Sequence, residues 1–191
     1  MSADIEVNDV VQLGSNQPAW WGFQPGHLWA GLLSPSRCWI EGTGAREMIE
    51  VPLVGPDGET FENHKGIVGV YSNGNRTGLS VVGANYGLLK DEEFFGILDQ
   101  VYQGRAVVET AGTLRNGRRV WALVKRDDWA VTAGDTIKSF DLWVNRHDSS
   151  GCFELHRTNV RVVCQNTWNL AIGDGRNRVI GVPHRSGILG N

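Results

Sequence analysis

Hydrophobic residues recur at intervals of three and four near the end of the chain. They are Val160, Val163, Cys164, Thr167, Trp168, Ala171 and Ile172. These positions lie on one side of a helix that has 3.6 residues per turn. Thr158 precedes the stripe as a candidate N-cap, and Gly173 follows it as a candidate C′ residue. The spacing therefore predicts an amphipathic helix over 158–172.

A second helix is predicted over 91–103. Its apolar stripe consists of Phe94, Phe95, Leu98, Val101 and Tyr102. Three acidic residues occupy its first turn, where their negative charges interact favourably with the positive end of the helix dipole. Gly104 marks the end of the helix.

Runs of β-prone residues separated by turn sequences predict antiparallel strands. The expected strands are 65–71, 79–83, 106–114, 119–125, 135–145 and 152–157. The third and fourth flank Arg115-Asn116-Gly117-Arg118, and an Asn-Gly pair is a strong hairpin signal because a type I′ turn needs positive φ at both central residues. GPDGET at 55–60 is a further turn that joins two short strands.

The order helix, strands, helix after Tyr86 predicts an α+β fold. We expect a curved antiparallel sheet with the helices near 91–103 and 158–172 packed on one face. Residues 1–191 are expected to form a single domain. Its first part, about 1–60, is rich in Trp, Gly and Pro and predicts a loop-rich N-terminal arm.

The composition is typical of a soluble globular protein, with 41% hydrophobic and 20% charged residues. No run approaches the roughly 20 apolar residues of a membrane span, and the acidic N-terminus lacks the pattern of a signal peptide. Cys38, Cys152 and Cys164 are an odd, widely spaced set that fits reduced thiols. These features favour a cytoplasmic protein.

Charge is unevenly distributed along the chain. Residues 1–104 contain 5 Lys and Arg against 13 Asp and Glu, whereas residues 105–191 contain 13 against 8. The basic second half indicates an anionic partner, and a dipolar monomer or a charge-matched dimer explains the asymmetry equally well.

Arginines are the main candidates for function. Arg115, Arg118 and Arg119 cluster at the predicted hairpin tip, and Arg157 and Arg161 lie one turn apart near the start of the predicted helix. Arginine binds phosphate with two parallel hydrogen bonds and stacks on bases. The candidates for stacking or partner contacts are Trp121, Trp168, Asn166 and Asn169. The alternative is a solvated face with internal ion pairs, and a pI of about 5.9 is low for a dedicated nucleic-acid-binding domain.

Catalytic and metal chemistry have weaker support. Cys164 with His184 and Asn166 would make a thiol site, but Cys164 lies on an apolar stripe in mid-helix, where a thiol is normally inert. His147, Asp148, Cys152 and His156 are metal-ligand types whose spacing matches no standard zinc site. No phosphate-binding glycine motif is present in the sequence. We therefore expect no cofactor, no metal and no catalytic residue.

Several segments resemble the phage/plasmid-like proteins of domain of unknown function family 932. The matching segments are PAWWGF (18–23), VGVYSNGN…VVGANYGLLKDEEFF (68–95), ETAGTLRNGRRVW (109–121), RTNVRVVCQNTWNLA (157–171) and PHRSG (183–187). Trp21 stands where this family's opening suggests a histidine. The resemblance implies a mobile-element origin and a longer chain with a further C-terminal part. The order of elements is also similar to that of single-strand annealing recombinases, a likeness of architecture alone.

The favoured function is that of a non-catalytic, phage- or plasmid-encoded protein of DNA metabolism that binds or anneals single-stranded nucleic acid as an oligomer. The alternative is an interaction protein that inhibits a host defence or regulatory protein. A second alternative is an enzyme that depends on Cys164 or a metal.

Overall fold

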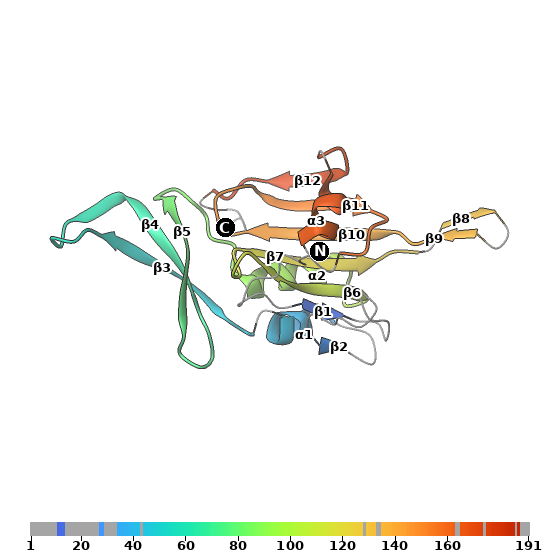
Figure 1. The fold of residues 1–191 in the computed structure, drawn as a ribbon, viewed down its shortest axis with the longest axis horizontal. Helices are drawn as coiled ribbons and strands as arrows, with labels where there is room; N and C mark the ends of the chain where they lie inside the picture. The colour runs from blue at the N-terminus through green and yellow to red at the C-terminus, as the bar shows by residue number, and fades with distance from the viewer. Residues whose placement is uncertain are drawn as a thin grey trace.

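A seven-stranded sheet, the main sheet, forms the body of the protein (Figure 1). The computed structural model describes residues 11–13, 27–28, 34–42, 44–127, 129–132, 135–162, 165–173, 175–185 and 187. The strand order is β12-β11-β10-β7-β6-β1-β2. The bounds are β1 (Val11–Leu13), β2 (His27–Leu28), β6 (Val108–Leu114), β7 (Arg119–Lys125), β10 (Phe140–Arg146), β11 (Phe153–Thr158) and β12 (Arg178–Val182). Neighbouring strands are antiparallel apart from the short parallel pair β1 and β2.

Two smaller sheets project from opposite ends of the body (Figure 1). The small sheet consists of β3 (Glu47–Val54), β4 (Thr60–Val70) and β5 (Arg76–Gly83), paired in that order. At the other end, β8 (Trp129–Thr132) and β9 (Asp135–Ile137) form a two-stranded ribbon between β7 and β10. The predicted strand 135–145 is therefore two strands, and β3 lies within the segment that we expected to be loop-rich.

The turn predictions are confirmed. The β3–β4 turn closes with a 2.8 Å hydrogen bond from the Gly55 amide to the Glu59 carbonyl. In the β6–β7 turn, Arg115, Asn116 and Gly117 have φ values of 56°, 54° and 81°. Positive φ at the two central residues is what a type I′ hairpin needs, and asparagine and glycine adopt it at little cost.

The core has two layers, one on each face of the main sheet. Alternate side chains of β7 point to opposite faces: Val120, Ala122 and Val124 pack in one cluster, and Trp121 and Leu123 pack in the other. Each large side chain buried in this way contributes roughly 1.5–3 kcal/mol. Because β7 is apolar on both faces, each face needs a covering layer.

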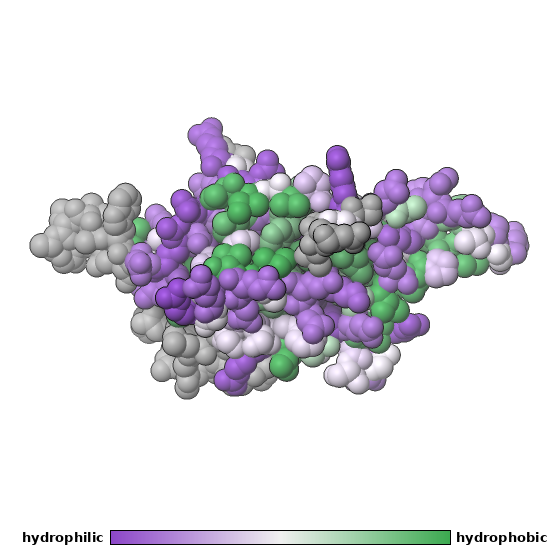
Figure 2. Space-filling model, turned by 180° about the vertical axis from the view of Figure 1, so that it is seen from behind, coloured by the Kyte–Doolittle hydropathy of each residue, from purple (hydrophilic) through white to green (hydrophobic). Residues whose placement is uncertain are grey.

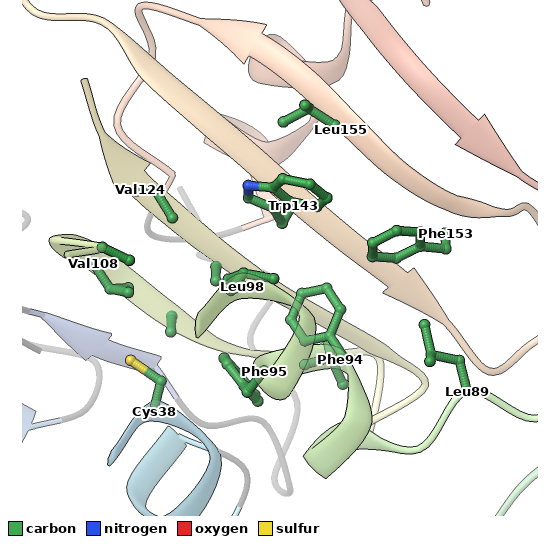
Figure 3. Packing of buried hydrophobic residues seen from close by; sticks show 14 residues of the cluster. Cys38, Leu89, Phe94, Phe95, Leu98, Val108, Val124, Trp143, Phe153 and Leu155 are labelled. Carbon is green, nitrogen blue, oxygen red and sulfur yellow. The ribbon is translucent and has the colours of Figure 1, made fainter. Parts of the chain in front are cut away.

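Helix α2 (Asp91–Val101) covers the first face. Its side chains Phe94, Phe95 and Leu98 pack toward Trp143 and Phe153 of the sheet (Figure 3). The predicted helix 91–103 is thus confirmed to within two residues, and the Gly104 that follows has a φ of 70°. Val101 is an exception, because its side chain is exposed.

Helix α3 (Gln165–Ile172) covers the second face through Trp168 and Ala171. The α+β class with an antiparallel sheet is confirmed, but the two helices lie on opposite faces instead of sharing one. The reason is the two-sided burial of β7 and β10, which the run of apolar residues in each strand reflects.

The predicted helix over 158–172 begins too early. β11 extends to Thr158, whose hydroxyl oxygen accepts a 3.0 Å hydrogen bond from the Val160 amide. Thr158 therefore ends a strand and forms a local turn, and it does not cap a helix. β-branched residues in this segment favour extended backbone over helix. The expected end is confirmed, because Gly173 has a φ of 59° and its amide bonds to the Asn169 carbonyl.

Two short helical segments lie beside the body, α1 (Pro35–Arg37) and the π-helical turn η1 (Cys38–Gly42). The Cys38 side chain is buried in the cluster that α2 covers (Figure 3). None of the helices in the described residues is long and apolar enough to cross a membrane. Trp20, Trp21 and Trp29 of the predicted N-terminal arm fall outside the described residues.

Candidate nucleic-acid interface

Four arginines gather where the β6–β7 turn meets the turn after β10. We call this group, Arg115, Arg118, Arg119 and Arg146, the tip cluster. Arg119 begins β7 and Arg146 ends β10, and the two residues are opposite each other in the ladder. The turns are joined directly, because the His147 amide donates a 2.8 Å hydrogen bond to the Arg118 carbonyl. The hairpin tip predicted from sequence therefore carries three of the five proposed arginines.

Positive charge is crowded around Arg119. Its side chain is 9% exposed, and its Nε lies 3.5 Å from Oδ2 of Asp148. Burial lowers the pKa of Arg119, and the charges of Arg115 and Arg146 lower it further, while Asp148 opposes them. An approaching anion would relieve this repulsion. Arg115 and Arg118 are exposed and would meet it first.

The Glu154 carboxylate binds Arg146 and also accepts hydrogen bonds from two other side chains. Nη2 of Arg146 donates a 2.8 Å hydrogen bond to Oε2 of Glu154. The same carboxylate accepts hydrogen bonds from His156, at 3.1 Å, and from Arg178, at 3.4 Å. Although burial raises the pKa of Glu154, the hydrogen bond with His156 and the charges of Arg146 and His156 lower it below its usual range. Glu154 therefore stays ionised and fixes Arg146 at the base of the cluster.

A buried polar network braces the tip from below. Arg46, just before β3, donates from Nε to Oδ2 of Asp91 at 2.6 Å and from Nη2 to the Gly117 carbonyl at 2.6 Å. Nε2 of His147 lies 2.8 Å from the other oxygen of Asp91. All three side chains are fully buried. The network thus fixes the backbone of the turn that presents Arg115 and Arg118.

Asp91 is ionised in this network. Burial raises the pKa of its carboxyl, but the charges of Arg46 and His147 and their hydrogen bonds outweigh burial and lower the pKa to about 2. A buried carboxylate with good partners is rigid, because removing either partner leaves an uncompensated charge. Asp91 is therefore suited to holding Arg46 and the β6–β7 turn in place, and not to acid–base chemistry.

The small sheet contributes a further arginine, Arg76, near the tip cluster. A pocket of about 360 Å³ at the β4–β5 turn is lined by Tyr71, Asn73, Asn75, Arg76 and Thr77. The Tyr71 hydroxyl lies beside the β6–β7 turn, 3.4 Å from where a Cβ on Gly117 would be. Two turns far apart in sequence therefore meet at the tip cluster.

Arg157 and Arg161 lie at the other end of the sheet and do not join the tip cluster. Arg157 pairs with Asp141 in the β10–β11 ladder, and its Nε lies 3.7 Å from that carboxylate. Arg161 follows β11, and its Nε lies 2.9 Å from Oε1 of Glu109. The expectation that these two lie one turn apart at the start of a helix is wrong, because α3 begins only at Gln165 and neither residue lies on a helix.

The proposed stacking tryptophans are core residues. Trp121 is 0% exposed and Trp168 is 2% exposed, and both pack between the main sheet and α3. Neither ring can stack on a base while the sheet is folded. Asn166 and Asn169 are exposed on α3, and Oδ1 of Asn169 accepts a 2.8 Å hydrogen bond from Gln165.

The proposed metal and thiol sites can be placed only in part. His147 binds Asp91 and His156 binds Glu154, so the set His147, Asp148, Cys152 and His156 is divided between two clusters. Within the described ranges, no three His, Cys, Asp or Glu side chains form a group that could hold a metal ion. Cys164 lies outside those ranges.

Sequence analysis missed Arg46, Asp91 and Arg146 as parts of this site. Asp91 is one of three acidic residues in the first turn of α2, where all three fit the helix dipole. Glu93 does act locally, and its Oε2 accepts a 2.8 Å hydrogen bond from the Lys90 amide. No signal in the sequence distinguishes the inward-pointing Asp91 from its neighbours.

The comparison with protein families matches residues 78–191, from within β5 to the last residue, to the family described as Domain of unknown function (DUF932). The chain belongs to this family. No curated protein and no solved structure matches the chain. The DUF932 region contains the tip cluster, α2 and α3, whereas Arg46 and most of the small sheet precede it. Of the segments that carry the resemblance, 109–121, 157–171 and 183–187 fall within the match.

Proposed function

We propose that this protein binds single-stranded nucleic acid through the tip cluster and performs no catalysis. In this proposal it is encoded by a phage or plasmid and acts in DNA metabolism, in the cytoplasm of a bacterial host, as an oligomer that holds or anneals strands. The observation that carries the proposal is the gathering of Arg115, Arg118, Arg119 and Arg146 where two turns meet. Burial, and then the charges of Arg115 and Arg146, lower the pKa of Arg119 there.

Phosphate oxygens are suitable partners for such a cluster. A guanidinium group donates two parallel hydrogen bonds to a phosphate, and several of them along a rigid turn can follow a backbone. The turn is braced by the Arg46 side chain, so little ordering is needed on binding. Because Trp121 and Trp168 are buried, we expect contacts to the phosphate backbone and little base stacking.

Binding by phosphate contacts predicts strong salt dependence and weak sequence preference. For single strands, each neutralised phosphate adds about 0.7 to the slope of log affinity against log salt concentration. Replacing Arg115 and Arg118 should therefore reduce the slope by about 1.4 if each residue contacts one phosphate.

The test is fluorescence anisotropy with a labelled oligonucleotide, comparing the wild type with Arg115→Gln/Arg118→Gln. We expect the double variant to bind at least about tenfold more weakly at low salt, with the smaller slope. A matched control, Lys90→Gln/Arg105→Gln, removes the same charge from exposed positions elsewhere. Equal losses in both variants, or no binding by the wild type at low salt, would refute the proposal.

A second candidate is an interaction protein that contacts a host protein. Hydrophobic side chains are exposed along the small sheet, at the right of the view in Figure 2. They include Val54, Phe61 and Val81, which are 54%, 46% and 53% exposed. Capture from a host lysate separates the two functions: nuclease treatment abolishes recovery under nucleic-acid binding and leaves it intact under protein binding.

A further inference from the structure

A polar pocket lies at the end of the main sheet opposite the tip cluster, beside the base of the β8–β9 ribbon. It has a volume of about 330 Å³ and is lined by Tyr102, Lys125, Arg126, Asp127, Asp141 and Arg157. Three of these side chains are cationic and two are carboxylates. The residues come from the end of α2, from β7 and the segment after it, and from β10 and β11.

Both arginines of the pocket share one carboxylate oxygen. Nη1 of Arg126 lies 3.3 Å and Nε of Arg157 lies 3.7 Å from Oδ1 of Asp141. Charge-assisted hydrogen bonds are usually about 2.7–2.9 Å long, so both contacts are loose. The side chains of Arg126 and Arg157 are 37% and 60% exposed. Each guanidinium therefore has further N–H groups directed to solvent or to the pocket.

The other oxygen of Asp141 is held from below. The Tyr102 hydroxyl donates a 2.9 Å hydrogen bond to Oδ2 of Asp141, and it accepts one of 2.9 Å from Nε1 of Trp143. Trp143 is buried in the cluster beneath α2 (Figure 3). Asp141 consequently cannot rotate to offer both oxygens to either arginine, and it works as a fixed spacer between the two guanidinium groups.

We propose that this pocket binds a phosphate monoester. A terminal phosphate has three unbridged oxygens, so each of the two guanidinium groups can bind a pair of them, with one oxygen shared. A phosphate within a strand has only two such oxygens. The volume lies near the lower limit of about 300 Å³ for small-molecule sites, which suits a single phosphorylated group.

Two sources share this chemistry, the 5′-phosphate end of a nucleic-acid strand and a free mononucleotide. The proposal does not rest on binding at the tip cluster, since the two sites use different residues at opposite ends of the sheet.

The test compares 5′-phosphorylated and 5′-hydroxyl forms of one short oligonucleotide, together with a mononucleotide and inorganic phosphate, by anisotropy and calorimetry. We expect the 5′-phosphate to raise wild-type affinity about tenfold and Arg126→Gln/Arg157→Gln to abolish that gain. The tip variant Arg115→Gln/Arg118→Gln should keep the tenfold ratio while it weakens both oligonucleotides.

A second, milder variant distinguishes a lost binding site from a protein that fails to fold. Tyr102→Phe keeps every charge of the pocket but frees Asp141 to rotate, so we expect a smaller, several-fold loss of the 5′-phosphate effect. Mononucleotide binding that Arg126→Gln/Arg157→Gln abolishes, without a preference for the phosphorylated strand, would support the pocket and assign it to free nucleotides. A wild type that binds neither mononucleotide nor phosphate and shows equal affinity for both oligonucleotides would overturn the proposal.

Discussion

The two ends of the main sheet both carry clustered cations, but they place the neighbouring carboxylate differently. At the tip, Asp91 lies beneath the turn and braces its backbone through Arg46, while the arginines above it crowd one another. At the pocket, Asp141 lies between Arg126 and Arg157 and separates them. Two further carboxylates at the tip, Asp148 and Glu154, contact Arg119 and Arg146 separately, whereas at the pocket one carboxylate oxygen is shared by both arginines.

The ends also differ in what supports them. The tip depends on the small sheet, because Arg46 immediately precedes β3 and reaches Gly117. The pocket depends on α2, whose last turn leads to Tyr102. Damage to the small sheet should therefore affect the tip and leave the pocket intact.

The largest expected effect comes from Asp91→Asn. This change leaves Arg46 buried without its counter-charge, and we expect the free energy of unfolding to fall by about 3–5 kcal/mol. Urea denaturation followed by tryptophan fluorescence measures the loss. As a control, Glu50→Gln breaks the partly exposed pair with Lys65, which is worth at most about 1 kcal/mol. A loss no larger than that of the control would mean that the network does not stabilise the tip.

A smaller effect is expected from Gly117→Ala. A Cβ on Gly117 would lie 2.0 Å from Nη1 of Arg46, so the guanidinium must move, and this movement weakens the hydrogen bond from its Nη2 to the Gly117 carbonyl. Alanine also adopts a φ of 81° less readily than glycine does. Adding this backbone cost to that of the disturbed hydrogen bond, we expect the free energy of unfolding to fall by about 3 kcal/mol.

Gly74→Ala is the matched control for this change. Gly74 also has a φ of 81°, but a Cβ there meets no atom within 4 Å, so only the backbone cost of about 1–2 kcal/mol applies. Gly117→Ala should in addition weaken oligonucleotide binding and leave the preference for a 5′-phosphate unchanged. Equal stability losses in the two variants would contradict the bracing role of Arg46.

The smallest effect concerns pH and His184. Burial and the nearby His147 lower the pKa of His184 from 6.5 to about 4, although its hydrogen bond to the Gly87 carbonyl opposes them. Between these pKa values the unfolded chain binds a proton that the folded chain does not, so stability falls as pH decreases from 6.5 to 4. The contribution amounts to about 2 kcal/mol between pH 7 and pH 5.

His184→Asn should remove this part of the pH dependence. The measurement is the urea midpoint at pH 7 and pH 5 in the wild type and the variant, with the exposed His64→Asn as a control. An unchanged difference between the two pH values in His184→Asn would show that another group is responsible.

Local sequence patterns correctly predicted the helices and turns that depend on interactions between residues close together in the chain. The β6–β7 hairpin follows from Asn116-Gly117, since few other residue pairs adopt two positive φ values at low cost. Helix α2 follows from the spacing of Phe94, Phe95 and Leu98. The start of α3 was missed because the apolar spacing begins at Val160, before the helix does, and because the candidate N-cap Thr158 is held in an extended backbone by the pairing of β11 with β10.

By itself, then, the sequence determined the α+β class, the hairpin that carries Arg115 and Arg118, and the family to which the chain belongs. Only the tertiary structure decided which face each helix covers, which arginines lie together and which tryptophans are buried. The reason is physical: turn geometry and amphipathic spacing act over a few residues, whereas the charge around a guanidinium depends on carboxylates such as Asp91, which lies 45 residues from Arg46 in the chain.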